Sequence, residues 1–342
     1  MTTLLKRLLL AGIGVLALIA AAQPGLAKEL RILAWQGYAD DDWVKAFETQ
    51  YNVDVSVVFI GTDDEIWAKI NGSEGKDFDL FAVNTAQLQR YIDVGLVTPY
   101  NLDQIPNQKE TLPRFRDLAK IKGVMRDGKV YAIPYAFDAI GIIYDTTKVG
   151  PAPTSMEALW DPKYQGKVLG YDNGEHNFSI TALTMGIADP FHLNDEQLEK
   201  AKEKLIGLNR NVLTLYTTAD EAMQLYRNND VALIFANYGQ QQVKMMLDAG
   251  LPIAYVNPKE GALAWLDTWA MTSGVRDRDL AESWVNFVLQ KKIGQELSDR
   301  TGFGNTVVPF PSAAESDTLV WLEAVENPTK RADLWNEIKA SP

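Results

Sequence analysis

Residues 53–83, VDVSVVFIGTDDEIWAKINGSEGKDFDLFAV, decide the class of fold. Residues 53–60 are rich in β-branched side chains and alternate in polarity, which predicts a strand, and residues 64–70 have helical spacing. Residues 78–83 form an apolar run of the kind found in strands that are covered on both faces. A strand, a helix and a second strand in this order predict a parallel sheet flanked by helices, and therefore an α/β fold.

The N-terminal neighbour of this stretch extends the same pattern. Residues 30–35 form a short β run, and the turn at residues 36–38 leads into a helix that begins near Asp40, Asp41 and Asp42. Three adjacent aspartates suggest a metal site, but acidic residues at a helix start are favoured by capping and by the helix dipole. We therefore expect these aspartates to cap a helix.

A second α/β series occupies the C-terminal half. It contains a strand at residues 168–171, a helix at 194–208 and a buried strand at 231–235. Two extended segments, residues 133–144 and 262–272, are placed to cross between the halves. We expect two parallel-rich sheets flanked by helices and joined by these extended hinge crossings. Lobe 1 is expected at residues 28–136, with roughly 265–310 returning to it, and lobe 2 at 137–264. A C-terminal helix is expected at 316–340, near the hinge and lobe 2.

Residues 1–27 predict export. Lys6 and Arg7 precede an apolar stretch at residues 8–22, and small residues at 25–27 offer a cleavage point. This pattern is typical of a secretory signal peptide, because a membrane anchor needs about 18 to 20 apolar residues without such interruptions. The chain has 0 cysteines, which excludes disulfides and a lipidated N-terminal cysteine. We expect a free periplasmic protein with no direct membrane insertion.

Composition and motifs exclude several functions. The formal net charge is −12, so nucleic acids and anionic membranes are poor partners. The chain has 2 histidines, no cysteine, and neither a Gly-x-Ser-x-Gly elbow nor a phosphate-binding glycine-rich loop. No helix carries the paired histidines of a zinc site. We expect a monomer that is not an enzyme and uses neither a metal nor a cofactor.

Aromatic and acidic residues remain as candidate ligand groups. Ligands of open α/β sheets bind beyond the carboxyl ends of strands, and Trp35 and Tyr38 stand where the first strand ends. Trp265 and Asp267 are two residues apart in an extended segment, so their side chains share one face. Aromatic faces attract an ammonium by about 0.5 to 2 kcal/mol each, and a carboxylate adds a charge-assisted hydrogen bond. These residues predict an amine cage, and the alternative is that the aromatics only pack in a core.

Five segments occur in the same order as in a known family. They are residues 33–38 (LAWQGY), 78–80 (FDL), 131–135 (YAIPY), 159–167 (LWDPKYQGK) and 257–267 (NPKEGALAWLD). On these segments the chain resembles the spermidine/putrescine-binding family of type 2 periplasmic binding proteins over nearly its whole length after residue 27. The resemblance implies a bilobed clamp whose acids hold the ligand's ammonium groups. It also implies delivery of the ligand to an ABC permease in the inner membrane.

The resemblance assigns roles by position and also shows departures. It implies that Asp267 is the central carboxylate, that Trp35, Tyr38 and Trp265 are cleft aromatics, and that Phe235 replaces a tryptophan as a flat apolar wall. Polyamine binders tend to show serine, and often an aromatic residue, in the loop that here reads Val83-Asn84-Thr85-Ala86. Where the family commonly places acids for the distal ammonium, this chain has Asn173 and His176, with Glu175 one residue away.

We therefore expect a binding protein for a small amine, with putrescine-like or spermidine-like ligands as the main hypothesis. Loss of a distal acid would leave a second ammonium unpaired, so a zwitterionic amine such as γ-aminobutyrate, 2-aminoethylphosphonate or a betaine is the alternative. A hydrolase using Asp267 and His176 is a remote alternative, and a sensory role would use the same cleft. The candidate ligand-binding residues are Trp35, Tyr38, Asn84, Asn173, Glu175, His176, Phe235, Trp265 and Asp267.

Overall fold

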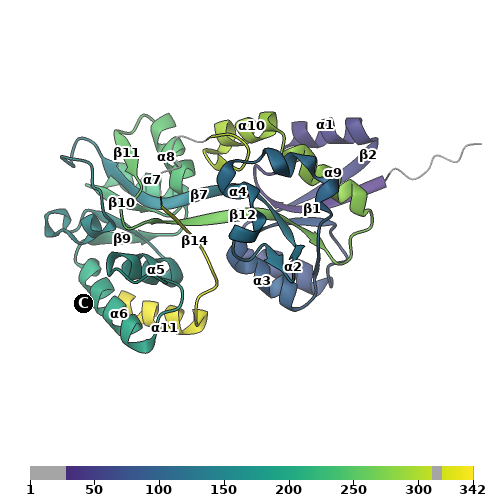
Figure 1. Cartoon of the computed structure of the whole chain (residues 1–342). Helices are drawn as coiled ribbons and strands as arrows, with labels where there is room; N and C mark the ends of the chain where they lie inside the picture. Colours follow the sequence, from purple (N-terminus) through teal and green to yellow (C-terminus); the bar gives the residue numbers. More distant parts are fainter. Residues whose placement is uncertain (1–27, 310–317, 342) are drawn as a thin grey trace, which may run out of the picture.

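The structure, a computed structural model, describes residues 28–309 and 318–341. Figure 1 shows two lobes side by side, with long strands running between them, as the sequence predicts. The expected signal peptide at residues 1–27 lies outside the described residues. Within the described ranges, no helix has both the length and the apolar character that crossing a membrane requires.

Lobe 1 is built on three parallel strands. Strand β1 (Lys28–Trp35) pairs in parallel with β2 (Val53–Ile60) on one side and with β3 (Leu80–Asn84) on the other. The connecting helices α1 (Asp41–Tyr51) and α2 (Asp63–Gly72) start soon after a strand ends, so their N-termini lie at the carboxyl edge of the sheet. The remaining elements on this side are α3 (Thr85–Asp93), β4 (Val97–Thr98), α4 (Pro113–Arg116), β5 (Met125–Arg126), β6 (Lys129–Val130), α9 (Arg278–Val288), α10 (Lys291–Thr301) and β13 (Gly304–Asn305).

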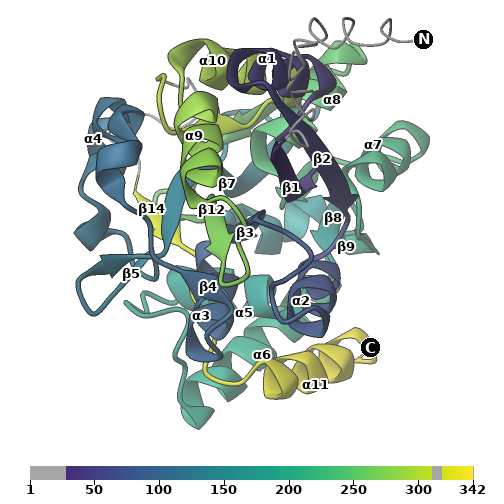
Figure 2. The same cartoon turned by 90° about the vertical axis from the view of Figure 1, so that its right-hand side faces the viewer.

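The β1 strand carries apolar side chains on both faces, because helices cover both. Leu30 and Ile32 pack with Phe47 of α1 and Trp284 of α9, whereas Leu33 joins a second cluster. That second cluster contains the buried apolar residues of α2 and α3. Figure 2 shows α1 and α9 on one side of the sheet and α2 and α3 on the other.

Lobe 2 repeats this arrangement. Strand β8 (Val168–Tyr171) pairs in parallel with β9 (Val212–Tyr216) and β10 (Leu233–Ala236). Its helices pack around two further apolar clusters, so each lobe has its own core. The other elements here are α5 (Gly174–Thr184), α6 (Asp195–Asn209), α7 (Ala219–Asn228), α8 (Gly239–Asp248) and β11 (Ile253–Val256).

Two long strands cross between the lobes. Strands β7 (Ala132–Asp145) and β12 (Ala262–Thr272) are antiparallel neighbours, and they join the sheets into the order β2-β1-β3-β12-β7-β10-β8-β9. The register between them shifts at Asp267/Thr268, opposite Ala136 and Pro134. A bulge of this kind lets a strand continue past a proline, which has no N–H for the ladder. The sheets are parallel in their outer parts and antiparallel at the crossings.

Two expectations for helix ends are wrong. The helix expected at 316–340 is α11 (Pro328–Lys339), because Leu319–Trp321 instead forms strand β14 beside β12, and residues 316–317 lie outside the described ranges. Helix α11 packs on α5 and α6 of lobe 2. The Asp40 side chain makes no capping hydrogen bond to α1. Arg300 attracts Asp40 and Asp42 instead, at 2.7 Å each.

Candidate functional site

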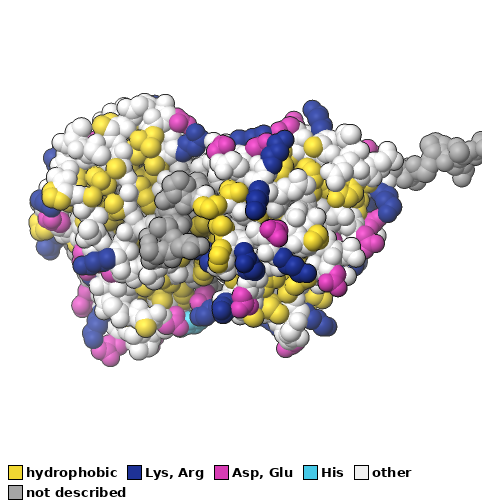
Figure 3. Space-filling view, turned by 45° about the horizontal axis from the view of Figure 1, so that its top comes forward, with side chains coloured by type: hydrophobic (Ala, Val, Ile, Leu, Met, Phe, Trp, Pro, Cys, Tyr) yellow, Lys and Arg dark blue, Asp and Glu magenta, His cyan; other side chains and the backbone are white. Residues whose placement is uncertain are grey.

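A cavity of about 800 Å³ opens between the lobes. Its walls come from the segments that follow β1, β2 and β3 in lobe 1 and those that follow β8, β9 and β10 in lobe 2. Strand β12 and the segment after β14 complete the lining. Figure 3 shows the lobes as two masses that meet at a waist. The carboxyl ends of both parallel sheets therefore face one space, as the rule for open α/β sheets expects.

Strand β12 brings Trp265 and Asp267 into this cavity together. The Asp267 residue is 9% exposed, and its Oδ2 accepts a hydrogen bond of 2.7 Å from the Tyr38 hydroxyl. Burial raises the pKa of Asp267 to about 7. The hydrogen bond from Tyr38 has the opposite effect on this pKa, but it is the smaller of the two. Asp267 is thus a carboxyl group whose charged form is costly while no cation is near.

Aromatic rings flank this carboxyl group. Trp35, at the end of β1, is half-buried in the cavity wall, and Trp265 packs edge-on against Phe303 with ring centroids 5.1 Å apart. Phe235 does not line the cavity. It is 2% exposed and lies behind Tyr171, whose ring is nearly parallel to it at 6.3 Å and faces the cavity. The flat wall expected from Phe235 therefore comes from Tyr171.

The first turn of α5 supplies the lobe 2 wall. Asn173 caps this helix, because its Oδ1 accepts from the His176 backbone N–H at 2.9 Å. The His176 ring contacts Asn237 Oδ1 through Nδ1 at 2.7 Å, and burial lowers the pKa of His176. An amide oxygen only accepts, so Nδ1 carries the proton and the neutral ring keeps Nε2 as an acceptor. This arrangement suits a ligand that donates hydrogen bonds.

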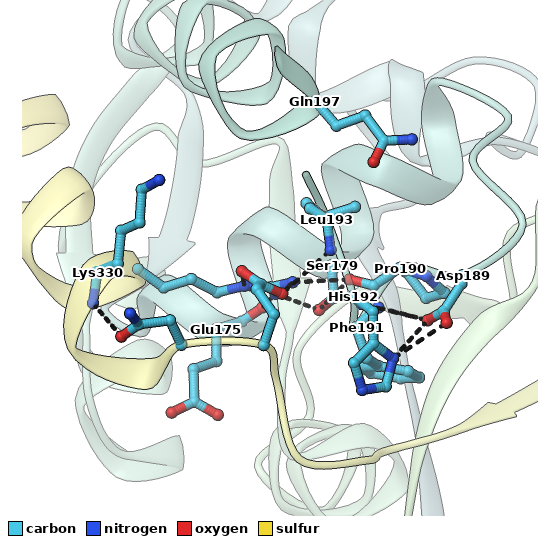
Figure 4. Close-up of polar contacts among 12 residues, drawn as sticks. Glu175, Ser179, Asp189, Pro190, Phe191, His192, Leu193, Gln197 and Lys330 are labelled. Atoms are coloured by element: carbon cyan, nitrogen blue, oxygen red, sulfur yellow. Dashed lines mark hydrogen bonds and ion pairs between the residues drawn. The ribbon is translucent and has the colours of Figure 1, made fainter. Parts of the chain in front are cut away.

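Glu175 lies in the same turn and lines the cavity. Burial raises the pKa of the Glu175 carboxyl, and the charge of Arg331 opposes this shift. The Arg331 guanidinium is fully buried beneath this turn, where it donates to the Glu175 backbone oxygen at 3.1 Å and to Ser179 Oγ at 2.8 Å. Figure 4 shows Glu175 and Ser179 beside the segment that contains Pro190. Arg331 therefore fixes the backbone that presents Glu175.

Three acids of the lining were not predicted from the sequence: Asp63, Asp64 and Glu323. The first two follow β2, so the strand-end rule would have found them if it had been applied to this strand. Asn84, which was expected to contact the ligand, donates to both carboxylate oxygens of Asp63 at 3.1 and 3.2 Å. Glu323 is paired with Lys122 at 2.7 Å.

The charge of the lining is one-sided. Among the described residues that line the cavity, five are acidic and none is lysine or arginine. Within the same described part of the chain, no three histidine or acidic side chains gather closely enough to hold a metal ion. The acids come from both lobes, from strand β12 and from the segment after β14.

Comparison with known proteins agrees with this architecture. The chain matches the family described as bacterial extracellular solute-binding protein over residues 42–329. It is 24% identical to spermidine/putrescine-binding periplasmic protein 1 of Haemophilus influenzae, covering 80% of this chain and 73% of the relative. It superimposes with a TM-score of 0.79 on the spermidine/putrescine transporter substrate-binding protein PotD of Streptococcus pneumoniae, at 20% identity, with 92% and 99% of the two chains covered.

A solved GABA receptor, Atu4243, also shares the fold. Its TM-score is 0.69 at 15% identity, and the match covers 92% of this chain and 97% of the receptor. Likenesses at this level of identity establish the bilobed α/β fold and leave the ligand to be argued from the cavity.

Proposed function

This chain belongs to the bacterial extracellular solute-binding protein family, and we propose that it captures a diamine or polyamine between its lobes for an ABC importer. The relatives named for spermidine and putrescine support this ligand class. The observation that carries the proposal is the charge of the cavity lining.

A cavity whose described lining has five acids and no lysine or arginine favours cations. Asp267 and Glu175 are the predicted partners of ammonium groups, and burial raises the pKa of both. Burial deprives each ionised carboxylate of its interactions with water, and an ammonium group would replace them with charge-assisted hydrogen bonds. In this proposal the ligand contributes the positive charge that pairs with these carboxylates.

Aromatic rings complete the site that we propose. Trp35, Tyr171 and Trp265 line the same cavity as the acids. Their faces suit the methylene groups that separate the ammonium groups of a diamine, and they also attract the ammonium groups directly. The neutral His176 ring adds an acceptor for an ammonium N–H.

A zwitterionic ligand fits this lining less well. The carboxylate of γ-aminobutyrate would enter a cavity in which no described lining residue is lysine or arginine. An unpaired anion among acids is repelled, and its desolvation is not compensated. Asn84, which was expected to help fix such an end, directs its Nδ2 donor to Asp63, and Asn173 uses its Oδ1 to cap α5.

The remaining parts of the proposal concern location and partners. We propose that residues 1–27 direct export, that the mature protein is free in the periplasm, and that it delivers its ligand to an inner-membrane permease.

The family consists of binding proteins, and a hydrolase reaction would require a nucleophile beside Asp267 and His176. Mass analysis of candidate amines after incubation with the protein would reveal any turnover.

A thermal-shift panel tests the ligand class. Ligand binding to the native state raises the unfolding temperature by mass action. We expect putrescine, cadaverine and spermidine to raise it and γ-aminobutyrate, 2-aminoethylphosphonate and betaine to leave it unchanged. Shifts from the zwitterions without shifts from the amines would refute the proposal.

A further inference from the structure

Asp138 is a buried acid of the crossing strand β7 that the ligand cavity leaves unused. It stands opposite Trp265 of β12, and residues directly opposite each other in antiparallel strands point to the same face of a sheet. Trp265 lines the cavity, whereas Asp138 is 3% exposed and is not among the described lining residues. The start of helix α8 covers it.

Helix α8 has no cap of its own. The residue before it, Tyr238, makes no capping hydrogen bond. Asp138 Oδ2 instead accepts from the Gln240 N–H at 2.6 Å, and its Oδ1 accepts from the Ala139 N–H at 2.8 Å. A capping side chain ordinarily accepts from the second or third N–H of the helix, and Gln240 is the second residue of α8. Asp138 therefore caps α8 from the crossing strand.

Gly239 fits this arrangement. Its φ is +50°, and a Cβ at this position would lie 2.4 Å from Asp138 Cγ. A larger residue would displace the carboxylate, so the first residue of α8 is glycine because both its backbone conformation and the close approach of Asp138 require it.

The charge of Asp138 acts on its surroundings as well. Burial raises the pKa of Asp138 well above its usual range, and hydrogen bonds from the backbone of Ala139, Gln240 and Gln241 oppose this rise. The positive end of the helix dipole favours the ionised carboxylate. After burial and the effects of Asp267, the charge of Asp138 also contributes to the raised pKa of Tyr38. A test must therefore separate the charge of Asp138 from its role as a cap.

The first turn of α8 contacts both lobes. Gly302 ends α10 in lobe 1, and a Cβ there would lie 2.8 Å from the Gln240 backbone oxygen. Figure 1 shows both helices above the crossing strands. Tyr238 and Gln241, at the start of α8, line the ligand cavity. Displacement of this turn would thus alter the cavity wall and the contact between the lobes together.

We propose that Asp138 is a positioning residue for ligand capture, which anchors the first turn of α8 on β7 and so holds Tyr238 and Gln241 at the cavity. This inference rests on the proposed function, and it requires no contact between Asp138 and the ligand. Without the anchor, the turn would be displaced in part of the population. Ligand binding would then have to restore it, which lowers the apparent affinity.

The test is calorimetric titration of putrescine into the wild type, Asp138→Ala, Asp138→Asn and Asn194→Ala. Asparagine caps helices about as well as aspartate, so Asp138→Asn removes the charge and keeps a capping oxygen. Asn194 is the matched control, because it caps α6 in the same lobe, accepting from the Gln197 N–H at 2.9 Å, and lies outside the cavity lining.

We expect Asp138→Ala to weaken putrescine binding by about three- to thirtyfold, the scale of losing one helix cap. Asp138→Asn and Asn194→Ala should bind within about twofold of the wild type. Hydrogen exchange of residues 237–244 without ligand should be faster in Asp138→Ala than in the wild type and the other two variants. Saturating putrescine should slow it.

Wild-type affinity in Asp138→Ala would overturn the inference. Equal losses in Asp138→Ala and Asp138→Asn would also overturn it, because the effect would then come from the charge. An equal loss in Asn194→Ala would show that binding follows the general stability of lobe 2.

Two further outcomes are distinguishable from these. Failure of the wild type to bind any diamine would refute the proposed function, and exchange of residues 237–244 in the ligand-free variants would still decide whether Asp138 anchors the turn. If Asp138→Ala does not fold, Gly239→Ala replaces it, because its Cβ displaces the carboxylate and should weaken putrescine binding in the same way.

Discussion

We propose that Asp267 is the residue on which ligand capture depends most. Its carboxyl group is buried, receives a hydrogen bond from Tyr38 and has a pKa raised to about 7. We predict that Asp267→Asn abolishes amine binding, because the ammonium loses its carboxylate. The same change should stabilise the ligand-free protein at about pH 8, since a buried unpaired charge is removed.

The pH dependence of that stabilisation follows from linkage. An unfolded aspartate has a pKa of about 3.9, so between that value and the folded value the native state holds a proton that the unfolded state has lost. Wild-type stability therefore falls as the pH rises through this window, and the advantage of Asp267→Asn should shrink at about pH 5. Thermal unfolding at both pH values measures this advantage. The control is Asp41→Asn, at an exposed position outside the cavity lining, whose effect on stability should be the same at the two pH values.

Ligand binding should depend on pH for the same reason. The cation requires the ionised form of Asp267, so affinity for putrescine should fall by up to about tenfold per pH unit below 7. Glu175 and Asp63, whose pKa values burial also raises, act in the same direction. Titration in buffers of different ionisation enthalpy should show proton release near pH 7. Affinity that is constant from about pH 8 to 5 would contradict this assignment.

Some residues of the candidate site could be predicted from the sequence and others could not, for physical reasons. Trp265 and Asp267 were found because a strand places alternate side chains on one face. Asp63 was missed because the strand-end rule was not applied to β2, an edge strand whose end also reaches the cavity. Asn84 and Asn173 line the cavity, and each also caps a helix. Residue type alone does not distinguish a helix cap from a ligand contact.

At the level of secondary-structure elements, Arg331 ties three segments of lobe 2 together. It is 0% exposed and is bound to Glu326 of the segment before α11, to Ser179 of α5 and to the Pro190 oxygen. We predict that Arg331→Ala lowers the free energy of unfolding by about 3 to 5 kcal/mol, because Glu326 and several acceptors lose a buried partner. Urea denaturation measures this change.

Lys330→Ala is the natural comparison for Arg331→Ala. Lys330 pairs with Asp195, which is 93% exposed, and an ion pair at the surface contributes at most about 1 kcal/mol. Equal losses for the two variants would show that the buried guanidinium does not hold these segments together.

Helices and strands were predicted best where the hydrophobic pattern that defines an element lies within that element. The alternation of helix and strand in residues 53–83 gave the right order because each element carries its own periodicity. Leu319–Trp321 was expected to be helical, but it pairs with β12, more than fifty residues away in the chain. Such a ladder depends on distant partners, and apolar runs this short do not distinguish strand from helix.

At the level of the whole molecule, β7 and β12 make the two lobes one sheet-linked clamp. Acids from both lobes and from a crossing strand line one cavity, so mutual repulsion favours separation of the lobes until a polycation binds. We predict that saturating spermidine lowers the radius of gyration in small-angle X-ray scattering. The Asp267→Asn variant should show no such change, and a bound wild type with an unaltered radius would contradict closure.

The most direct test is calorimetric titration of the wild-type protein with putrescine and with γ-aminobutyrate at about pH 8, where Asp267 is ionised. The two ligands have chains of similar length and share one ammonium, and they differ in the charge at the other end. The acid-lined cavity predicts binding of putrescine and none of γ-aminobutyrate. Tighter binding of γ-aminobutyrate than of putrescine would contradict the claim that the cavity selects for positive charge.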